Sequence, residues 1–165
     1  MLENKIQLII TSIWKYSNDL FVDSISNMLS WFNKKINIHF WVLVKNDFVP
    51  KRWEIYYIDL GINIWTEINK NRPCLVLSPK KYNKSWQVII APIKTFRENI
   101  NNNFQYIINA NEINGLTNNS IIDISHIKSV SKKRFSKQIW FVEDCYMDSI
   151  DIWLTNILWI KKATT

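Results

Sequence analysis

The sequence predicts a mainly β fold, a β-barrel accompanied by helices, and three observations lead to this prediction. Apolar residues recur at intervals of three and four within the first 50 residues, as they do in an amphipathic helix. From residue 51 the apolar period becomes two, and five short β-rich runs follow in close order. After residue 143 the helical period returns. Short strands at such spacing favour a small, strongly bent barrel over an alternating β/α sheet.

Residues 1–50 predict an N-terminal amphipathic helical extension. Its helix follows a possible cap at Ser17 or Asn18, and its apolar face consists of Leu20, Phe21, Ile25, Met28, Leu29, Phe32 and Ile36. This face suits packing on the main domain better than binding a membrane surface or a partner helix, because the polar face is not rich in Lys and Arg. Residues 37–44 are either a strand or the end of the helix, and Pro50 marks a boundary.

The apolar stretch at residues 6–14 is the place to look for a targeting signal. It is too short to cross a bilayer, and no small-residue cleavage pattern follows it. We therefore expect a soluble, cytoplasmic protein that does not contact a membrane.

Residues 51–162 predict the main domain. Its strands are expected at residues 54–60, 74–78, 87–92, 104–108 and 120–130, and Asn114-Gly115 is a turn before the last of them. A C-terminal helix is expected to close the barrel, with Glu143 and Asp144 in its first turn, near the positive end of its dipole. The apolar face of that helix consists of Met147, Ile150, Leu154, Ile157 and Leu158.

The net positive charge of the chain indicates what kind of partner it binds. Lys and Arg number 21 against 14 Asp and Glu, which gives a net charge of +7. Such a surface favours a polyanion, either nucleic acid or an acidic protein segment. Cys74 and Cys145 lack any metal-ligand spacing, and their apolar neighbours predict reduced core residues.

Tryptophan and glycine have unusual frequencies. The chain has 9 Trp and 2 Gly, whereas average usage predicts roughly a dozen Gly in this length. Trp53, Trp65 and Trp86 stand where turn chemistry favours a residue that tolerates positive φ. Some bacterial lineages read the codon UGA as glycine. Our hypothesis is that several of these tryptophans are such codons; the alternative is a protein that is truly rich in Trp.

Arg72 and Glu67 are the first candidates for chemistry, because they share a polar loop that leads into the strand after Pro73. A guanidinium held beside an extended backbone matches phosphate oxygens and stabilises the added negative charge of a phosphorane. Glu67 suits either a general base or an ion pair with Arg72 or Lys70. No zinc spacing, Walker-type loop or GxSxG motif is present in the sequence, which argues against metalloproteases, NTPases and α/β-hydrolases.

Basic residues and hydroxyls predict the contacts to a polyanion. Lys80, Lys81 and Lys84 follow the second expected strand, and aromatic neighbours such as Tyr82 offer base stacking beside them. Composition alone does not separate RNA from an acidic peptide; if the polyanion is RNA, the residues expected to contact it are Thr66, Lys70, Ser78, Lys80, Lys81, Lys84, His126 and Lys128.

Taken in order, these motifs resemble the MazF/PemK (Kid) family of type II toxin-antitoxin ribonucleases. Arg52-Trp53-Glu54-Ile55 matches the opening R-G-E-I block, and Trp65-Thr66-Glu67 followed by Arg72-Pro73 matches the G-S/T-E and R-P motifs. Pro92-Ile93-Lys94-Thr95 resembles the P-I-T/S block, and residues 120–131 resemble the late Q-I-R-T run. The resemblance covers residues 52–160. Tryptophan stands at the family's glycine positions 53, 65 and 86.

The resemblance implies an SH3-like barrel that is usually a homodimer, is inhibited by a cognate antitoxin and cuts single-stranded RNA without a metal or cofactor. The substrate's 2′-hydroxyl attacks the adjacent phosphorus and leaves a 2′,3′-cyclic phosphate. By matching positions, Arg72 stabilises the phosphorane and Glu67 is a candidate base. The family's catalytic Thr or Ser falls on Lys94. Either a one-residue bulge restores the hydroxyl through Thr95, or Lys94 supplies positive charge instead.

Two other functions remain open at this stage. In the first, the barrel binds RNA or an antitoxin but has lost cleavage through Lys94. In the second, the chain is a gyrase inhibitor of the related CcdB type, which shares the fold and acts on DNA supercoiling.

Overall fold

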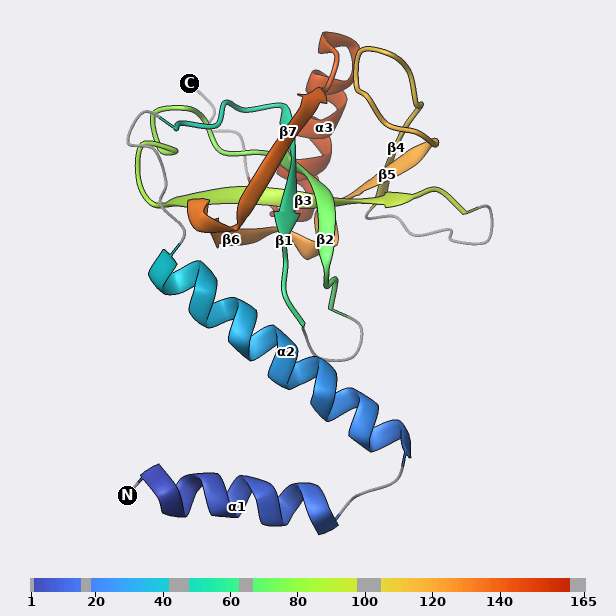
Figure 1. Cartoon of the computed structure of the whole chain (residues 1–165). Coiled ribbons are helices and arrows are strands. Elements are labelled where there is room, and N and C mark those ends of the chain that lie inside the picture. The colour runs from blue at the N-terminus through green and yellow to red at the C-terminus, as the bar shows by residue number, and fades with distance from the viewer. Residues whose placement is uncertain (1, 16–18, 42–47, 63–66, 98–104, 161–165) are drawn as a thin grey trace. The chain divides into compact units, whose positions relative to one another are not determined.

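The computed structural model describes residues 2–15, 19–41, 48–62, 67–97 and 105–160 (Figure 1). The chain divides into two compact units, Met1–Val42 and Leu43–Thr165, and each is described by itself. In the described part of the chain, no helix has both the length and the apolar character needed to span a membrane.

The first unit holds two helices, α1 at Leu2–Lys15 and α2 at Asp19–Trp41. This confirms the helical character of the extension and adds a separate first helix. The expected caps Ser17 and Asn18 lie outside the described residues. Helix α2 continues through residue 41, so the beginning of segment 37–44 is the end of the helix rather than a strand; residues 42–44 are not described.

The second unit is a strongly bent antiparallel sheet with a helix after it. Its strands are β1 (Glu54–Asp59), β2 (Asn71–Val76), β3 (Gln87–Thr95), β4 (Gln105–Ile108), β5 (Ser120–Asp123), β6 (Lys128–Ser131) and β7 (Phe135–Phe141). Two 3₁₀ turns, η1 (Ile124–His126) and η2 (Lys132–Arg134), connect the last three strands, and helix α3 (Asp144–Ile157) follows β7. The predicted C-terminal helix is confirmed.

Strand β3 organises the sheet, because its two halves pair with different neighbours. The sheet order is β4-β5-β3-β2-β1-β7, and β6 pairs with β3 beside this path. The first half of β3 pairs with β6, from Gln87↔Ser131 to Ile90↔Lys128, and its last three residues pair with β5. The pairings of the described residues leave the sheet open between β7 and β4, so they do not show a barrel closed by strand pairing.

The observed strands differ from the expected ones in two places. The run 120–130 is two strands separated by η1, because the backbone turns at residues 124–126. Strand β7 was absent from the prediction. Its centre, Ser136-Lys137-Gln138, is polar and exposed, and its register against β1 shifts twice, so it lacks the alternation that marks a half-buried strand.

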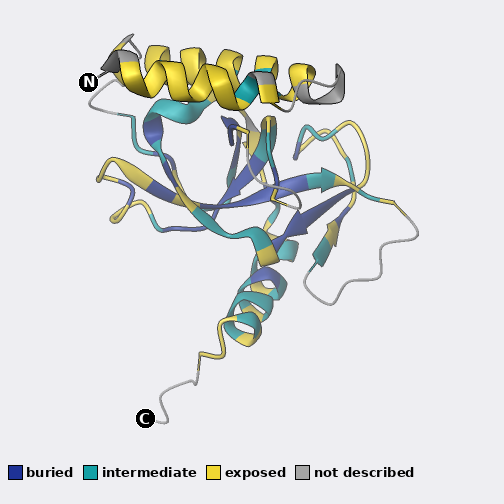
Figure 2. Cartoon of the chain, turned by 90° about the horizontal axis from the view of Figure 1, so that it is seen from below, coloured by how far each residue is buried: buried dark blue, intermediate teal, exposed yellow. Residues whose placement is uncertain are grey.

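The core lies on both faces of the sheet, and buried residues are concentrated in the strands (Figure 2). One cluster includes Ile55, Leu75 and Ile93 together with Ile150 of α3, so the helix covers that face. The other includes Ile58, Cys74 and Val88, with Phe48 and Phe135 against them. Cys74 is buried as expected. The same prediction was wrong for Cys145, which is exposed because it lies in the first turn of α3, away from the sheet.

Candidate active site

A cavity of about 170 Å³ lies where β2 begins and β3 ends. Its walls combine basic, hydroxyl and amide side chains from β1, β2, β3, β5 and the loop before β5. The lining residues are Tyr57, Arg72, Pro73, Ile93, Lys94, Thr95, Gly115, Leu116, Thr117, Asn118 and Ser120. Three of the four residues predicted to be catalytic, Arg72, Lys94 and Thr95, therefore share one cavity.

The strand register explains why these residues meet. Strands β2 and β3 run antiparallel with Cys74 opposite Pro92. Arg72 lies near the start of β2 and Lys94 near the end of β3, so antiparallel pairing brings both to the same end of the pair. Strand β1 adds Tyr57, whose partner on β2 is Pro73. The cavity is thus a consequence of pairing, and residues 22 positions apart in sequence become neighbours.

Arg72 is half-buried, and its side chain is held by the loop that precedes β2. Its Nε donates a hydrogen bond to the backbone carbonyl of Asn69 at 2.8 Å. A guanidinium carries five N–H donors, and the bond through Nε orients the plane that bears the other four. This geometry suits a group that must face a phosphate in a fixed direction.

Lys94 forms an ion pair with the carboxylate of Asp123 on the neighbouring strand β5. The Asp123 side chain is only 1% exposed and that of Lys94 is 30% exposed. The same carboxylate accepts a hydrogen bond from Ser125 Oγ at 2.6 Å, and its Oδ2 lies 3.0 Å from His126 Nδ1. Burial alone raises the pKa of Asp123, but Lys94, Ser125 and His126 together lower it below its ordinary value.

Two hydroxyls complete the cavity. Thr95 is exposed at the end of β3, opposite Ser120 of β5, and Ser120 Oγ donates to the carbonyl of Asn118 at 2.7 Å. The β3–β5 ladder runs in regular register from Ile93 to Thr95, so no bulge in this ladder moves Thr95 into the place of Lys94. Both side chains line the cavity from adjacent positions of one strand.

The structure separates the other predicted residues from this cavity. Glu67 is exposed in a bend and is absent from the lining, and Thr66 and Trp65 lie outside the described residues. Lys70 is exposed just before β2, with φ +66°. Ser78 is buried, and its hydroxyl donates to Asn83 Oδ1 and accepts from the N–H of Ile89, so it supports the turn that follows.

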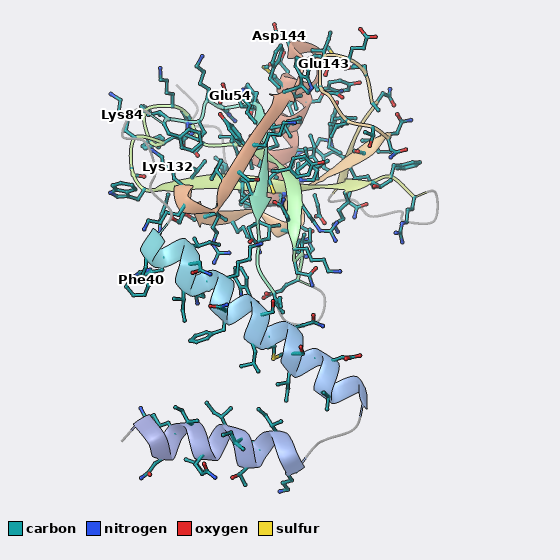
Figure 3. All side chains as sticks on the ribbon, viewed as in Figure 1. Phe40, Glu54, Lys84, Lys132, Glu143 and Asp144 are labelled. Carbon is teal, nitrogen blue, oxygen red and sulfur yellow. The ribbon has the colours of Figure 1, made fainter. Side chains whose placement is uncertain are left out.

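The basic loop lies at the other end of the β2–β3 hairpin. Lys80, Lys81 and Lys84 are exposed between the end of β2 and the start of β3, whereas Arg72 and Thr95 mark the opposite ends of those strands. Figure 3 shows Lys84 on the same side of the sheet as Lys132, whose N–H donates to the carbonyl of Trp86. RNA contacts by these lysines would therefore extend well beyond the cavity.

His126 ends the 3₁₀ turn η1 between β5 and β6, and Lys128 is the first residue of β6. His126 contacts Asp123 as described, and Lys128 pairs with Ile90 of β3. The charge of Lys128 also acts on the buried thiol of Cys74. Burial raises the pKa of that thiol to about 12, although Lys128 and Arg72 act in the opposite direction. Cys74 is therefore a core residue rather than a nucleophile.

Sequence reasoning missed Tyr57, Asn118, Ser120 and Asp123. The signal for Asp123 was available, because an acidic residue inside the run Ile121-Ile122-Asp123-Ile124 must be buried in a strand and needs a cationic partner. Tyr57 and Asn118 carried no comparable signal. In the described part of the chain, no three His, Cys, Asp or Glu side chains gather as ligands for a metal ion.

Comparison with solved structures identifies the fold. MazF from Deinococcus radiodurans is similar with a TM-score of 0.59 and 18% identity, over 69% of this chain and all of that one. The MazE–MazF complex of the same organism matches with a TM-score of 0.54 and 18% identity, over 70% of this chain and all of that one. A mycobacterial endoribonuclease in complex with its cognate antitoxin matches with a TM-score of 0.54 and 18% identity, over 68% and 98%.

A family model gives the more specific result. No curated protein sequence matches the chain. Residues 51–158, however, match the model of the PemK-like, MazF-like toxins of type II toxin-antitoxin systems. That segment contains every strand of the sheet, the helix α3 and the whole cavity. The chain thus belongs to the PemK-like, MazF-like toxin family of type II toxin-antitoxin systems.

Proposed function

We propose that this toxin is an endoribonuclease that cuts single-stranded RNA by attack of the substrate's own 2′-hydroxyl. The observation that supports it is the cavity in which Arg72, Lys94 and Thr95 meet. Two cationic side chains and a hydroxyl around about 170 Å³ suit one phosphodiester group. The fold of a mycobacterial endoribonuclease, shared at 18% identity, is consistent with this chemistry.

The reaction needs a proton acceptor, a stabiliser of charge and a proton donor. The 2′-oxygen forms a bond to phosphorus while the bond to the 5′-oxygen breaks, which leaves a 2′,3′-cyclic phosphate and a 5′-hydroxyl. An internal nucleophile gains from proximity. The Arg72 guanidinium offsets the negative charge that accumulates on the phosphorane oxygens, and Thr95 donates a hydrogen bond to one of them.

The acceptor of the 2′-hydroxyl proton comes from outside the cavity lining, which contains no carboxylate. Glu67 is our candidate, because it is exposed on the loop that leads to Arg72. The 5′-oxygen takes its proton from water or from the ammonium of Lys94. Asp123 does not fill the role of base, since both of its oxygens are engaged.

The wider assembly follows from the same proposal. We expect a cytoplasmic homodimer in which the bent sheet forms an SH3-like barrel, controlled by a cognate antitoxin. The relatives solved together with an antitoxin support that partner. RNA would extend from the cavity toward the exposed lysines at residues 80, 81 and 84.

A fluorogenic single-stranded RNA, incubated with the full chain in excess EDTA, tests the proposal. We expect cleavage that Arg72→Ala slows by about 10²- to 10³-fold, and products that carry a cyclic phosphate at the new 3′ end. The matched control is Arg134→Ala, because the guanidinium of Arg134 bonds the carbonyl of Asp59 and is absent from the cavity lining. Binding of RNA without cleavage would favour a non-catalytic module. Inhibition of gyrase without RNA cleavage would favour the CcdB-type activity.

A further inference from the structure

Asp123 is a buried carboxylate that neither the core nor the proposed reaction step requires. A charge in the interior is costly unless it is paired and fully hydrogen-bonded. Asp123 meets both conditions, through the ion pair with Lys94 and the contacts with Ser125 and His126. An apolar residue would serve the strand at a lower desolvation cost, so the arrangement points to a local role.

The role concerns the direction of Lys94. A lysine side chain has four rotatable bonds and three N–H donors, and a free one samples many positions. In this structure the ammonium is fixed at the carboxylate, while the side chain forms part of the cavity wall that it shares with Arg72. The pair uses one donor direction and leaves the others for a group in the cavity.

We propose that Asp123 is a positioning residue that holds the Lys94 ammonium where it donates to the scissile phosphate in the transition state. The inference rests on the proposed ribonuclease function. Ser125 and His126 act one step further away, because they contact the carboxylate of Asp123 and hold it in place. Lys94 then complements Arg72. The Asn69 carbonyl, in the loop before β2, orients the guanidinium of Arg72, and Asp123 of β5 orients the ammonium of Lys94.

A double-mutant cycle tests this inference. We expect Lys94→Met and Asp123→Asn each to lower kcat by about 10- to 100-fold with KM nearly unchanged, since a misplaced group affects the transition state more than binding. The double variant should lose no more than either single one. Independent, multiplying losses would overturn the inference, as would a wild-type kcat in Asp123→Asn.

A measurement on the wild-type chain covers the case in which Asp123→Asn fails to fold. The ¹H–¹⁵N signal of the Lys94 ammonium is identified by its loss in Lys94→Arg. We expect it to shift when a 2′-O-methylated copy of the cleaved RNA binds. Binding without such a shift would overturn the inference. The two proposals fail in different ways. If the wild-type chain cuts RNA much faster than Arg72→Ala does, but replacing Lys94 has no effect, only the positioning role fails. If the wild-type chain does not cut RNA at all, the proposed function fails.

A second inference comes from the backbone of two tryptophans. Helix α3 ends in a Schellman motif: the N–H of Trp159 donates to the carbonyl of Asn156, and the N–H of Ile160 donates to that of Thr155. Trp159 occupies the left-handed position of the motif, with φ +51°, and is 81% exposed. Glycine is the usual residue there, because a Cβ is disfavoured in that conformation.

Trp53 repeats the pattern at the start of the sheet. Its φ is +73°, and its backbone is fixed on both sides, since its N–H donates to Val76 and its carbonyl accepts from Val142, both at 2.9 Å. In the described part of the chain, three residues other than glycine have a positive φ: Trp53, Trp159 and Lys70. Two of three such positions therefore carry tryptophan, a bulky residue for which this conformation is a genuine outlier. The expectation was wrong for Trp86, which has no positive φ.

We propose that positions 53 and 159 are glycine in the protein as its source organism makes it, with UGA as the codon. The expected results are UGA at both codons and glycine masses at both positions in peptides from source cells; UGG codons or tryptophan masses would overturn the inference. In the tryptophan-containing chain, Trp159→Gly should raise the folded-to-unfolded ratio about fivefold. Trp153→Gly, in the core-facing part of α3, should lower it. A fall in Trp159→Gly would count against the inference.

Discussion

Arg72 is tied to Asn69: its Nε donates to the Asn69 carbonyl, so the guanidinium takes its direction from the backbone three residues earlier. A lysine at this position keeps the positive charge but lacks the planar group that makes this bond. We therefore expect Arg72→Lys to recover little of the activity lost in Arg72→Ala, a loss of about 10²- to 10³-fold in kcat. Single-turnover cleavage of the fluorogenic RNA measures both. Full recovery in Arg72→Lys would show that charge alone is sufficient.

The hydroxyl of Thr95 is predicted to act in the transition state. Thr95→Val removes the donor and keeps the shape of the side chain, whereas Thr95→Ser keeps the donor. We expect kcat to fall about tenfold in the valine variant and to stay near wild type in the serine variant, as for the loss of one hydrogen bond. Equal rates in the two variants would exclude a role for the hydroxyl.

Asp123 makes stability depend on pH in a defined direction. Its folded-state pKa is lowered, so its contribution is present above the unfolded-state pKa of about 3.9 and is lost as pH falls through the folded-state value. Asp123→Asn should therefore be less stable than wild type at pH 7, and the difference should narrow toward pH 3. Urea denaturation at a series of pH values measures it. A difference that is constant with pH would contradict the ion pair.

Asn83 is expected to be the most sensitive polar residue of the basic loop. It is fully buried, and its Nδ2 donates to the carbonyls of Pro50 and Ser78, both at 2.8 Å. Asn83→Ala leaves two buried carbonyls without donors and should lower the free energy of unfolding by about 2 kcal/mol or more. Ser85→Ala, in the same loop but exposed, should change it by less than about 0.5 kcal/mol. Chemical denaturation compares the two.

Replacing Lys80, Lys81 and Lys84 together by alanine tests whether RNA reaches the far end of the hairpin. We expect weaker RNA binding at unchanged kcat, because the three ammonium groups are exposed and lie away from the cavity. If all three contact phosphates, the slope of log K against log salt should become less steep by about 2. An unchanged slope would place the RNA elsewhere.

The sequence predicted the parts of the fold that depend on local pattern. Four of the five expected strands and the C-terminal helix lie close to their expected places. The order of apolar and polar residues along the sequence is enough to recognise an alternating strand or one apolar face of a helix. Strand β7 was missed because its side chains are mostly exposed and only its pairing with β1 makes it a strand. The split of the run 120–130 at η1 likewise depends on tertiary pairing.

The sequence predicted several residues of the candidate site but not how they are arranged in space. Arg72 carried a signal because it precedes Pro73 at a strand junction, and Lys94 because it replaces a hydroxyl in a motif. That Lys94 meets Asp123 follows from the pairing of β3 with β5, which connects segments nearly 30 residues apart. In the sequence, Ser78 could not be told from the other candidate hydroxyls. Only the structure shows that its hydroxyl bonds Asn83 within the turn and is not part of the cavity.

The left-handed backbone at Trp53, if it reflects a UGA codon read as glycine, determines in which bacteria the toxin gene can produce a toxin. Position 53 precedes every strand of the sheet, so a ribosome that reads UGA as stop would release a peptide that ends before the first strand of the toxin domain. A gene with UGA at that codon would be harmless after transfer to bacteria that use the standard code. Its toxicity, and any addiction that it imposes on its host, would be confined to lineages that share the reassigned codon.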